Sequence, residues 1–387
     1  MVNRTVTATS IFIYRVFFHR LRAFPGPFWA RVTKLWTRES HLRGEYHRDS
    51  LELHHKYGDI VRVAPNELDI NDLEAIKLIY GPGSKLYKGP WYDGPSATAE
   101  ARSIQGTKDH AIHRSRRKVW SQGNSGSAMA EFEPLMVRHV DEFIEQIRLR
   151  KEVDIALWIN FLSFDIMGDL TFDMPFNMVK SGETHHFMTT LRRFMKAVSM
   201  LSAIPWLNSL VHALPTDSAV KDLEEYSRDC FKTRKAQGSS RKDLFYYLLG
   251  EDQNGTKLTE LGADHGLTHS YCRRLGYVIH RDGRDARNWG RLNEFIPERW
   301  IGEGPEPYNN KDAFIPFSIG AYSCVGKPLA MMELRVITAK IAKDFDISFS
   351  KEMDVAGFER GVLKRLYNDS TKCKSGLLTA LLMCVFT

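Results

Sequence analysis

One cysteine stands in a glycine-containing loop that could hold a metal through a single thiolate bond. The segment 314–330 reads FIPFSIGAYSCVGKPLA and contains Cys324 between Gly320 and Gly326. Gly320 permits a tight bend because glycine adopts backbone angles that are closed to other residues. Apolar residues at helical spacing predict a helix from Lys327, and the dipole of that helix favours an ionised thiol at its N-terminus. The loop therefore predicts Cys324 as a metal ligand; the alternative is a small buried cysteine that packs beside a helix.

Six positions of this loop fit the pattern F-x-x-G-x-x-x-C-x-G-x-x-L-A, namely Phe317, Gly320, Cys324, Gly326, Leu329 and Ala330. The loop resembles the haem-binding loop of the cytochrome P450 monooxygenases. The segment FDIMGDLTF, which ends at Phe172, resembles fungal microsomal members. The resemblance implies a mainly α fold with small β-sheets, haem b as the cofactor and Cys324 as the ligand of its iron.

Two residues upstream carry donors that suit a carboxylate. His113 and Arg117 lie four residues apart, on one face of a helix predicted within residues 108–122. The resemblance implies that they bind a haem propionate, and that Phe317, Gly320, Tyr322 and Gly326 complete the cofactor site. Tyr322 stands where many members carry arginine or histidine, so it offers a hydroxyl without a charge. The alternative is a solvated basic face formed with the neighbouring arginines and Lys118.

Composition limits the class of protein. The 387 residues are 43% hydrophobic, which supports a large core, and we expect one main domain over residues 25–387. Five scattered cysteines do not form a disulfide framework, which favours a reducing compartment. The net charge of +7 is compatible with an ordinary basic surface, and no nucleic-acid-binding motif accompanies it. The resemblance implies an NADPH-cytochrome reductase as an acidic partner.

The first 24 residues predict a membrane contact. Residues 10–18 are apolar except for Arg15, which is too short a stretch to span a bilayer, and the rigid sequence Pro25-Gly26-Pro27 follows. We expect a shortened anchor or an interfacial helix on the cytosolic face of the endoplasmic reticulum membrane, as the resemblance implies. The alternatives are a plain surface helix and a signal peptide, although no small-residue cleavage site precedes the prolines.

The remaining pattern predicts the elements around the site. Alternation predicts a hairpin of residues 60–63 and 68–70, and helical periodicity predicts helices within residues 73–80, 131–150, 155–172, 185–201 and 218–235. The helix 155–172 is apolar on nearly all sides, which predicts burial. At its end Asp173 stands where the fungal pattern has glycine.

The family pattern stops within residues 268–276. Residues 257–268 resemble the start of the long helix that crosses the family fold above the haem, whereas residues 277–282 resemble a much later strand. The oxygen-activating threonine and acid of that helix are missing, so the sequence identifies no catalytic residue. The E-x-x-R helix is missing too, and the resemblance places Arg299 as its partner. We therefore expect a centrally truncated fold.

Three hypotheses for function remain open. The first is a haem-thiolate monooxygenase that inserts one atom of O₂ into a small apolar substrate and that the truncation leaves impaired or inactive. The second is a chain that binds haem without turnover or folds only in part. The third is a zinc site, for which the candidate ligands are His265, His269, Cys272 and His280.

Overall fold

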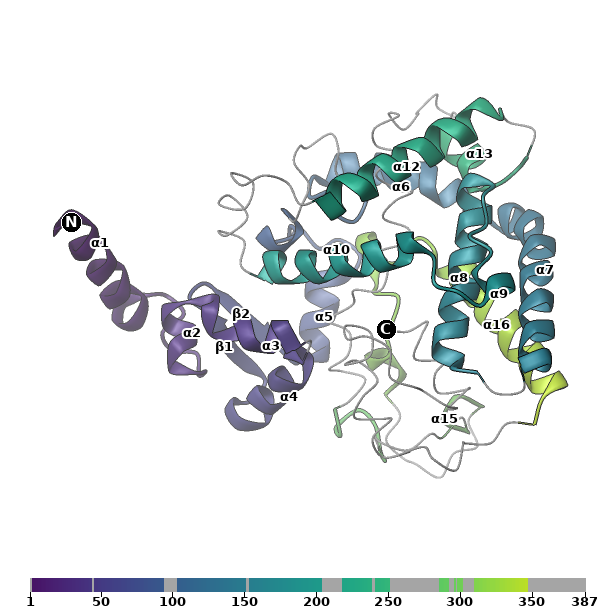
Figure 1. Ribbon diagram of the computed structural model, residues 1–387. Helices are drawn as coiled ribbons and strands as arrows, with labels where there is room; N and C mark the ends of the chain where they lie inside the picture. Colours follow the sequence, from purple (N-terminus) through teal and green to yellow (C-terminus); the bar gives the residue numbers. More distant parts are fainter. Residues whose placement is uncertain are drawn as a thin grey trace.

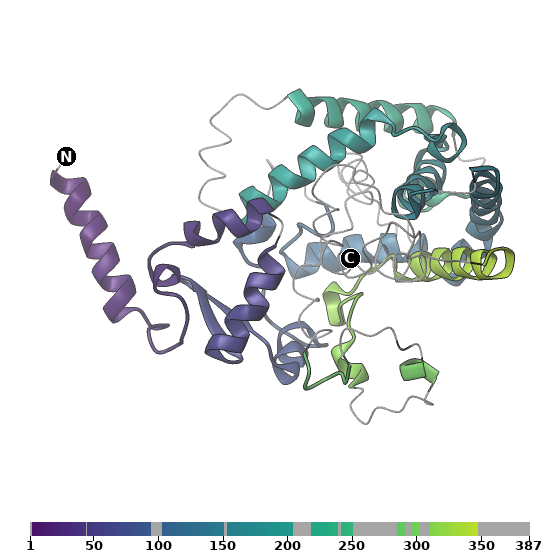
Figure 2. The same ribbon diagram turned by 60° about the horizontal axis from the view of Figure 1, so that its bottom comes forward.

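The computed structural model describes residues 2–43, 45–93, 103–150, 153–203, 218–238, 241–250, 285–291, 296, 298–301 and 310–346. Over these residues the chain is mainly helical with one two-stranded sheet, as the sequence predicts. The buried residues of the main hydrophobic core all lie from Val119 onwards, and α1 (Val2–Ile13) projects away from the rest in both views (Figures 1 and 2).

The small sheet is the predicted hairpin. Strands β1 (Ile60–Ala64) and β2 (Glu67–Ile70) run antiparallel, with Ile60 opposite Ile70 and Val61 opposite Asp69. The turn between them holds Pro65 and Asn66, residue types that favour turns. Short helices precede the sheet and one follows it: α2 (Phe28–Val32), η2 (Lys34–Thr37), α3 (Arg38–Arg43), α4 (Tyr46–Tyr57) and α5 (Leu73–Tyr80).

Three long helices form the centre of the core. These are α7 (Gly126–Arg150), α8 (Ile155–Phe172) and α16 (Lys327–Asp344). Leu334, Ile337 and Ile341 of α16 are buried, as their spacing predicts. Ser163 of α8 donates to Glu333 of α16 at 2.6 Å, which fixes the two helices in register. The site loop directly precedes α16, so this packing sets its position.

Helix α8 is buried on most sides, as its composition predicts. Within the described part of the chain it is the one helix long and apolar enough to cross a membrane, but 67% of that window is buried inside the protein. Its role here is therefore that of a core helix. It ends at Asp173, which has a φ of 56°. This left-handed conformation explains the glycine expected there, and the Asp173 carboxylate forms an ion pair with Arg241.

Further helices complete the described structure. They are η1 (Tyr14–Phe18), η3 (Pro90–Asp93), α6 (His110–Gln122), α9 (Met178–Ser181), α10 (His186–Ala203), α12 (Ser218–Ala236), α13 (Leu244–Leu249), α15 (Glu298–Ile301), η5 (Lys311–Ala313) and η6 (Gly320–Tyr322). Helices α10 and α12 lie side by side across the molecule (Figure 1).

The described residues from Asp285 onwards contact the residues on either side of the hairpin. Asp285 accepts from Asn71 at 2.9 Å, and Arg287 contacts both Asp285 and Asp59. Hydrogen bonds from Arg287 lower the pKa of Asp285 to about 2. The predicted break near residues 268–276, the segments 257–268 and 277–282, and the candidate zinc ligands all lie outside the described residues. Arg299 is buried and donates to the carbonyl of Arg291 at 2.8 Å.

Candidate functional site

The cysteine loop is held in place by its own backbone. The N–H of Cys324 donates to the carbonyl of Phe317 at 2.7 Å, and the N–H of Ser323 donates to that of Gly320 at 3.1 Å. Gly326 caps α16, whose first turn contains Pro328. Cys324 is a half-buried thiol rather than half of a disulfide. The sequence prediction that this thiol lies just before a helix N-terminus is confirmed.

Gly320 is required by its surroundings. Its φ is +68°, and a Cβ at this position would lie 1.9 Å from the carbonyl oxygen of Tyr80, at the end of α5. The loop therefore packs backbone against backbone on α5, which only a residue without a side chain allows.

Substitution of Gly320 by alanine is expected to lower the free energy of unfolding by about 3 kcal/mol or more, because left-handed strain and overlap with Tyr80 act together. Urea unfolding measures the change. Gly89→Ala is the matched control, since an added Cβ there meets no atom within 4 Å. Equal midpoints for the two variants would show that the loop does not depend on this contact.

Helix α6 supplies the predicted arginine. Asp109 caps the helix by accepting from the N–H groups of Ala111 and Ile112. One turn further along, Arg117 donates to the carbonyl and, at 2.9 Å, to the hydroxyl of Ser323. The structure thus brings Arg117 to the residue next to Cys324.

His113 and Tyr322 also meet at this place. Their rings are 4.5 Å apart, edge to face, and the hydroxyl of Tyr322 lies 3.2 Å from Nδ1 of His110. His113 is buried, and burial together with Lys88, Arg117 and His110 lowers its pKa to about 4. The imidazole is therefore neutral at neutral pH and offers an N–H group rather than a full charge.

Lys88 is a site residue that the sequence did not reveal. Its Nζ lies 4.2 Å from the ring centre of Tyr322 and donates to the carbonyl of Gln105 at 2.7 Å. Burial and the charge of Arg117 lower its pKa to about 7. Lys88 belongs to a loop rich in glycine and proline, which has no periodicity that could point it towards Tyr322.

Two phenylalanines of the loop have different surroundings. Phe314 lies 4.6 Å from the ring of Trp300 and 6.3 Å from that of Trp289, so it joins a tryptophan pair. Phe317 has the ammonium of Lys327 at 5.8 Å from its ring centre. Phe317 therefore lies at the start of α16, close to the thiol-bearing turn.

The donor set fits a haem. Iron in a haem needs one axial thiolate from the protein, and no group of three or more metal-ligating side chains occurs among the described residues. Arg117 is a cation, and Lys88 is a cation below its pKa of about 7. The charges of Lys88, Arg117 and His110 act on His113. Such a cluster suits the two carboxylates at the edge of a haem, since charge-assisted hydrogen bonds are the stronger ones.

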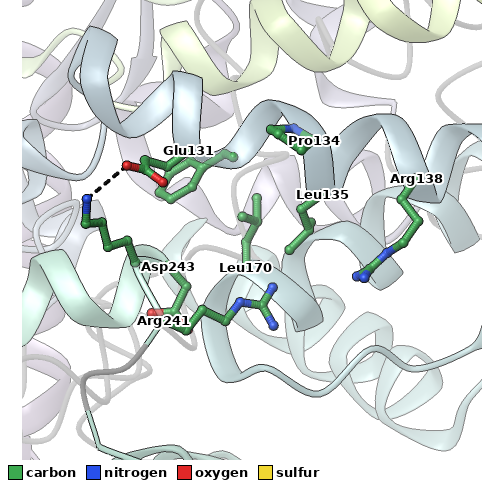
Figure 3. A pocket seen from close by; sticks show the side chains of 9 residues that line it. Glu131, Pro134, Leu135, Arg138, Leu170, Arg241 and Asp243 are labelled. Carbon is green, nitrogen blue, oxygen red and sulfur yellow. Dashed lines mark hydrogen bonds and ion pairs between the residues drawn. The ribbon is translucent and has the colours of Figure 1, made fainter.

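A separate pocket lies between α7, α8 and the segment before α13 (Figure 3). Its volume is about 500 Å³, and none of its lining residues belongs to the cysteine loop. Its charges are paired within the protein. Lys242 contacts Glu131 at 3.0 Å, and Arg138 and Arg241 both contact the buried Asp169. Ion pairs therefore account for these charged side chains of the pocket lining.

A mainly helical fold with a single thiol in a glycine-containing loop is typical of haem-thiolate proteins. The sequence model described as Cytochrome P450 matches residues 23–266 and 276–370. The chain belongs to the cytochrome P450 family, whose cofactor is haem b and whose members are oxidoreductases.

Curated relatives are fungal monooxygenases. The chain is 28% identical to cytochrome P450 monooxygenase FCK2 of Fusarium pseudograminearum over 90% of this chain and 80% of that protein. It is 28% identical to cytochrome P450 monooxygenase orf5 of Eupenicillium brefeldianum over 91% and 90%. Tryprostatin B 6-hydroxylase of Neosartorya fischeri is 28% identical over 89% and 80%. These similarities support a haem-thiolate monooxygenase.

Proposed function

We propose that Cys324 would bind the iron of haem b and that Lys88, His113, Arg117 and Tyr322 would hold its propionates. The observation that carries the proposal is the contact of Arg117 with Ser323, which joins the cationic cluster to the thiol-bearing turn. Phe317, Gly320 and Gly326 shape the loop around the ligand.

The chain's own groups then have distinct tasks. When bound, the haem supplies the oxygen chemistry that inserts one atom of O₂ into an apolar substrate, and a cysteine thiolate favours cleavage of the O–O bond. Cys324 lies just before the N-terminus of α16, a place that suits a negatively charged ligand. The half-buried position of the thiol limits its contact with water. Arg117 orients the turn, and Lys88 neutralises negative charge at the cofactor edge.

The central truncation limits this activity. The family sequence model matches the chain in two parts, separated at residues 267–275, where the pattern of the long helix stops. The alignment with the Fusarium relative spans 443 positions, more than the whole 387-residue chain, so positions of the relative have no counterpart here. Both findings support a chain that lacks the helix over the haem and is impaired in turnover. A haem binder without turnover is the second candidate function.

The proposal also includes a contact with the membrane and a contact with a reductase. Phe12, Phe17 and Phe18 are exposed on the N-terminal helical segment, which suits an interfacial helix on the cytosolic face of the endoplasmic reticulum. Exposed Arg114 and Lys118 on α6 are candidate contacts for an acidic NADPH-cytochrome reductase. The substrate class is a small apolar molecule of fungal secondary or xenobiotic metabolism.

Reconstitution tests the function. The purified chain is loaded with haem, reduced, exposed to carbon monoxide and then supplied with reductase, NADPH and a panel of apolar substrates. A thiolate-type Soret band with little or no product is expected. The same band with rapid product formation would contradict the impairment, and the absence of the band would contradict the haem site.

Lys88 makes haem affinity depend on pH. Its pKa is lowered to about 7 in the haem-free site, and a propionate nearby raises that pKa, so haem binding takes up a proton above neutral pH. Haem affinity is therefore expected to fall as the pH rises from about 7 to 9, by up to about tenfold per unit. Fluorescence-quenching titration with haem measures this slope.

The Lys88→Met variant is expected to bind haem more weakly at neutral pH and to lose most of the slope. Lys85→Met is the matched control, because Lys85 is exposed in the same loop. If the haem affinity of Lys88→Met still falls with pH as in the unaltered chain, another group takes up the proton. Lys88 would then not belong to the propionate site.

A further inference from the structure

A cluster of arginines lies where the N-terminal segment meets the small sheet. Arg62 of β1 is fully buried, and its Nη2 donates to the carbonyl of Pro65 at 2.6 Å and to that of Arg15 at 3.3 Å. Its Nε and Nη1 are buried without a hydrogen-bond partner, as is Nε of Arg31. Three guanidinium nitrogens are thus left unsatisfied in a place shielded from water, which is costly for a cation.

The charges in this cluster act on one another. Burial is the largest cause that lowers the pKa of Arg62, and the charges of Arg31 and Arg15 lower it further. Burial likewise lowers the pKa of His19, and the charges of Arg62, Arg20 and Arg15 lower it further. No carboxylate of the described chain acts on either group in these interactions. The cluster therefore has the charge and the open donors of an anion site.

Arginine donors suit a phosphate in particular. A guanidinium presents paired N–H groups that match the oxygens of a phosphate, and it is less strongly hydrated than an ammonium group. Arg15 and Arg31 are only partly buried, and Arg15 also donates to the carbonyl of Val32 at 2.8 Å. They therefore offer an approach from solvent to the unsatisfied groups beneath them.

Exposed aromatic side chains stand beside the cluster in the chain. Phe17 and Phe18 of η1 are 57% and 67% exposed, and Phe28 and Trp29 of α2 are 52% and 61% exposed. Helix α2 packs against both η1 and β1, so these aromatics and the arginines share one region of the molecule. Aromatic residues next to basic ones are typical of the headgroup level of a membrane. Helix α1, which projects from the rest of the molecule (Figure 1), adds the exposed side chains of Val6, Ile11 and Phe12.

We propose that Arg15, Arg31 and Arg62 form a binding site for the phosphate of an anionic phospholipid headgroup. This inference rests on the membrane contact under the proposed function and adds a specific lipid site to it. The bound phosphate satisfies the open N–H groups of Arg31 and Arg62, and the neighbouring aromatics enter the headgroup layer. The site thereby fixes the angle between the N-terminal helix and the sheet.

Vesicle sedimentation of the full chain tests the site. The vesicles are phosphatidylcholine alone or phosphatidylcholine with a minor fraction of phosphatidic acid. Tighter binding to the second kind is expected. Arg31→Gln should weaken that binding by about fiftyfold, against about fivefold for Arg20→Gln, which removes the same charge from the neighbouring exposed segment. If the two variants lose the same affinity for these vesicles, the proposed site is wrong and the basic surface binds the lipid without a specific site.

Two further measurements separate the outcomes. Thermal unfolding should show stabilisation by soluble short-chain phosphatidic acid that is lost in Arg62→Met; equal stabilisation by inorganic phosphate would overturn the lipid as the ligand. Equal binding of the unaltered chain to both vesicle kinds would overturn this inference but keep the membrane contact, and binding to neither would overturn both. The ferrous-carbonyl spectrum should be unchanged in Arg31→Gln, which keeps the test independent of the haem site.

Discussion

Cys324→Ser protein loaded with haem is expected to lose the thiolate-type Soret band of its ferrous-carbonyl complex. Cys324 is the one cysteine in the loop that meets the propionate cluster through Ser323 and Arg117. A neutral hydroxyl cannot replace the electron donation of a thiolate. Haem affinity should fall by at least about a hundredfold, since loss of even an outer hydrogen bond to a metal ligand costs ten- to a hundredfold.

Cys230→Ala is the control for this experiment. Cys230 is buried in the core and belongs to α12, not to the loop 314–326. The variant should keep the thiolate band, with at most a small loss of stability from the smaller side chain. A thiolate band that survives Cys324→Ser and disappears in Cys230→Ala would show that the wrong cysteine has been assigned.

Insertion of the missing central segment is expected to raise product formation from little or none to ordinary monooxygenase turnover. The segment between residues 268 and 276 would come from the Fusarium relative, whose alignment exceeds the length of this chain. A helix that crosses a domain about 30 Å wide needs about 20 residues. The insertion also supplies the family's threonine and acid. Product yield per haem, with reductase and NADPH present, is the measurement.

A matched insertion separates folding from chemistry. The same segment with its threonine and acid replaced by alanine should restore the helix, and with it thermal stability, but not the full rate. If the chain without any insertion already turns over as fast as the chimera, the truncation does not impair it. If the chimera binds haem no better and makes no product, the proposed break lies elsewhere.

The sequence predicted most of the local structure because short-range patterns decide it. Alternation of apolar and polar residues predicted the hairpin of β1 and β2. The apolar run of α8 predicted a buried helix with the bounds that the structure has. Asp173 shows where a pattern alone was less informative. Its left-handed backbone explains the expected glycine, but its ion pair with Arg241 comes from a distant segment. Contacts of that kind leave no periodic signal.

For the candidate site, the motif and the fold made separate contributions. The spacing around Cys324 indicated the family and makes Cys324 the proposed ligand, because a thiolate loop needs glycines at fixed positions. The spacing of His113 and Arg117 placed two donors on one helix face. Only the tertiary structure brought Lys88 to Tyr322, packed Gly320 against Tyr80 and lowered the pKa of His113. Burial and the proximity of charges depend on segments far apart in the chain, so the sequence determined the chemistry of the ligand, and the fold decided the charge around it.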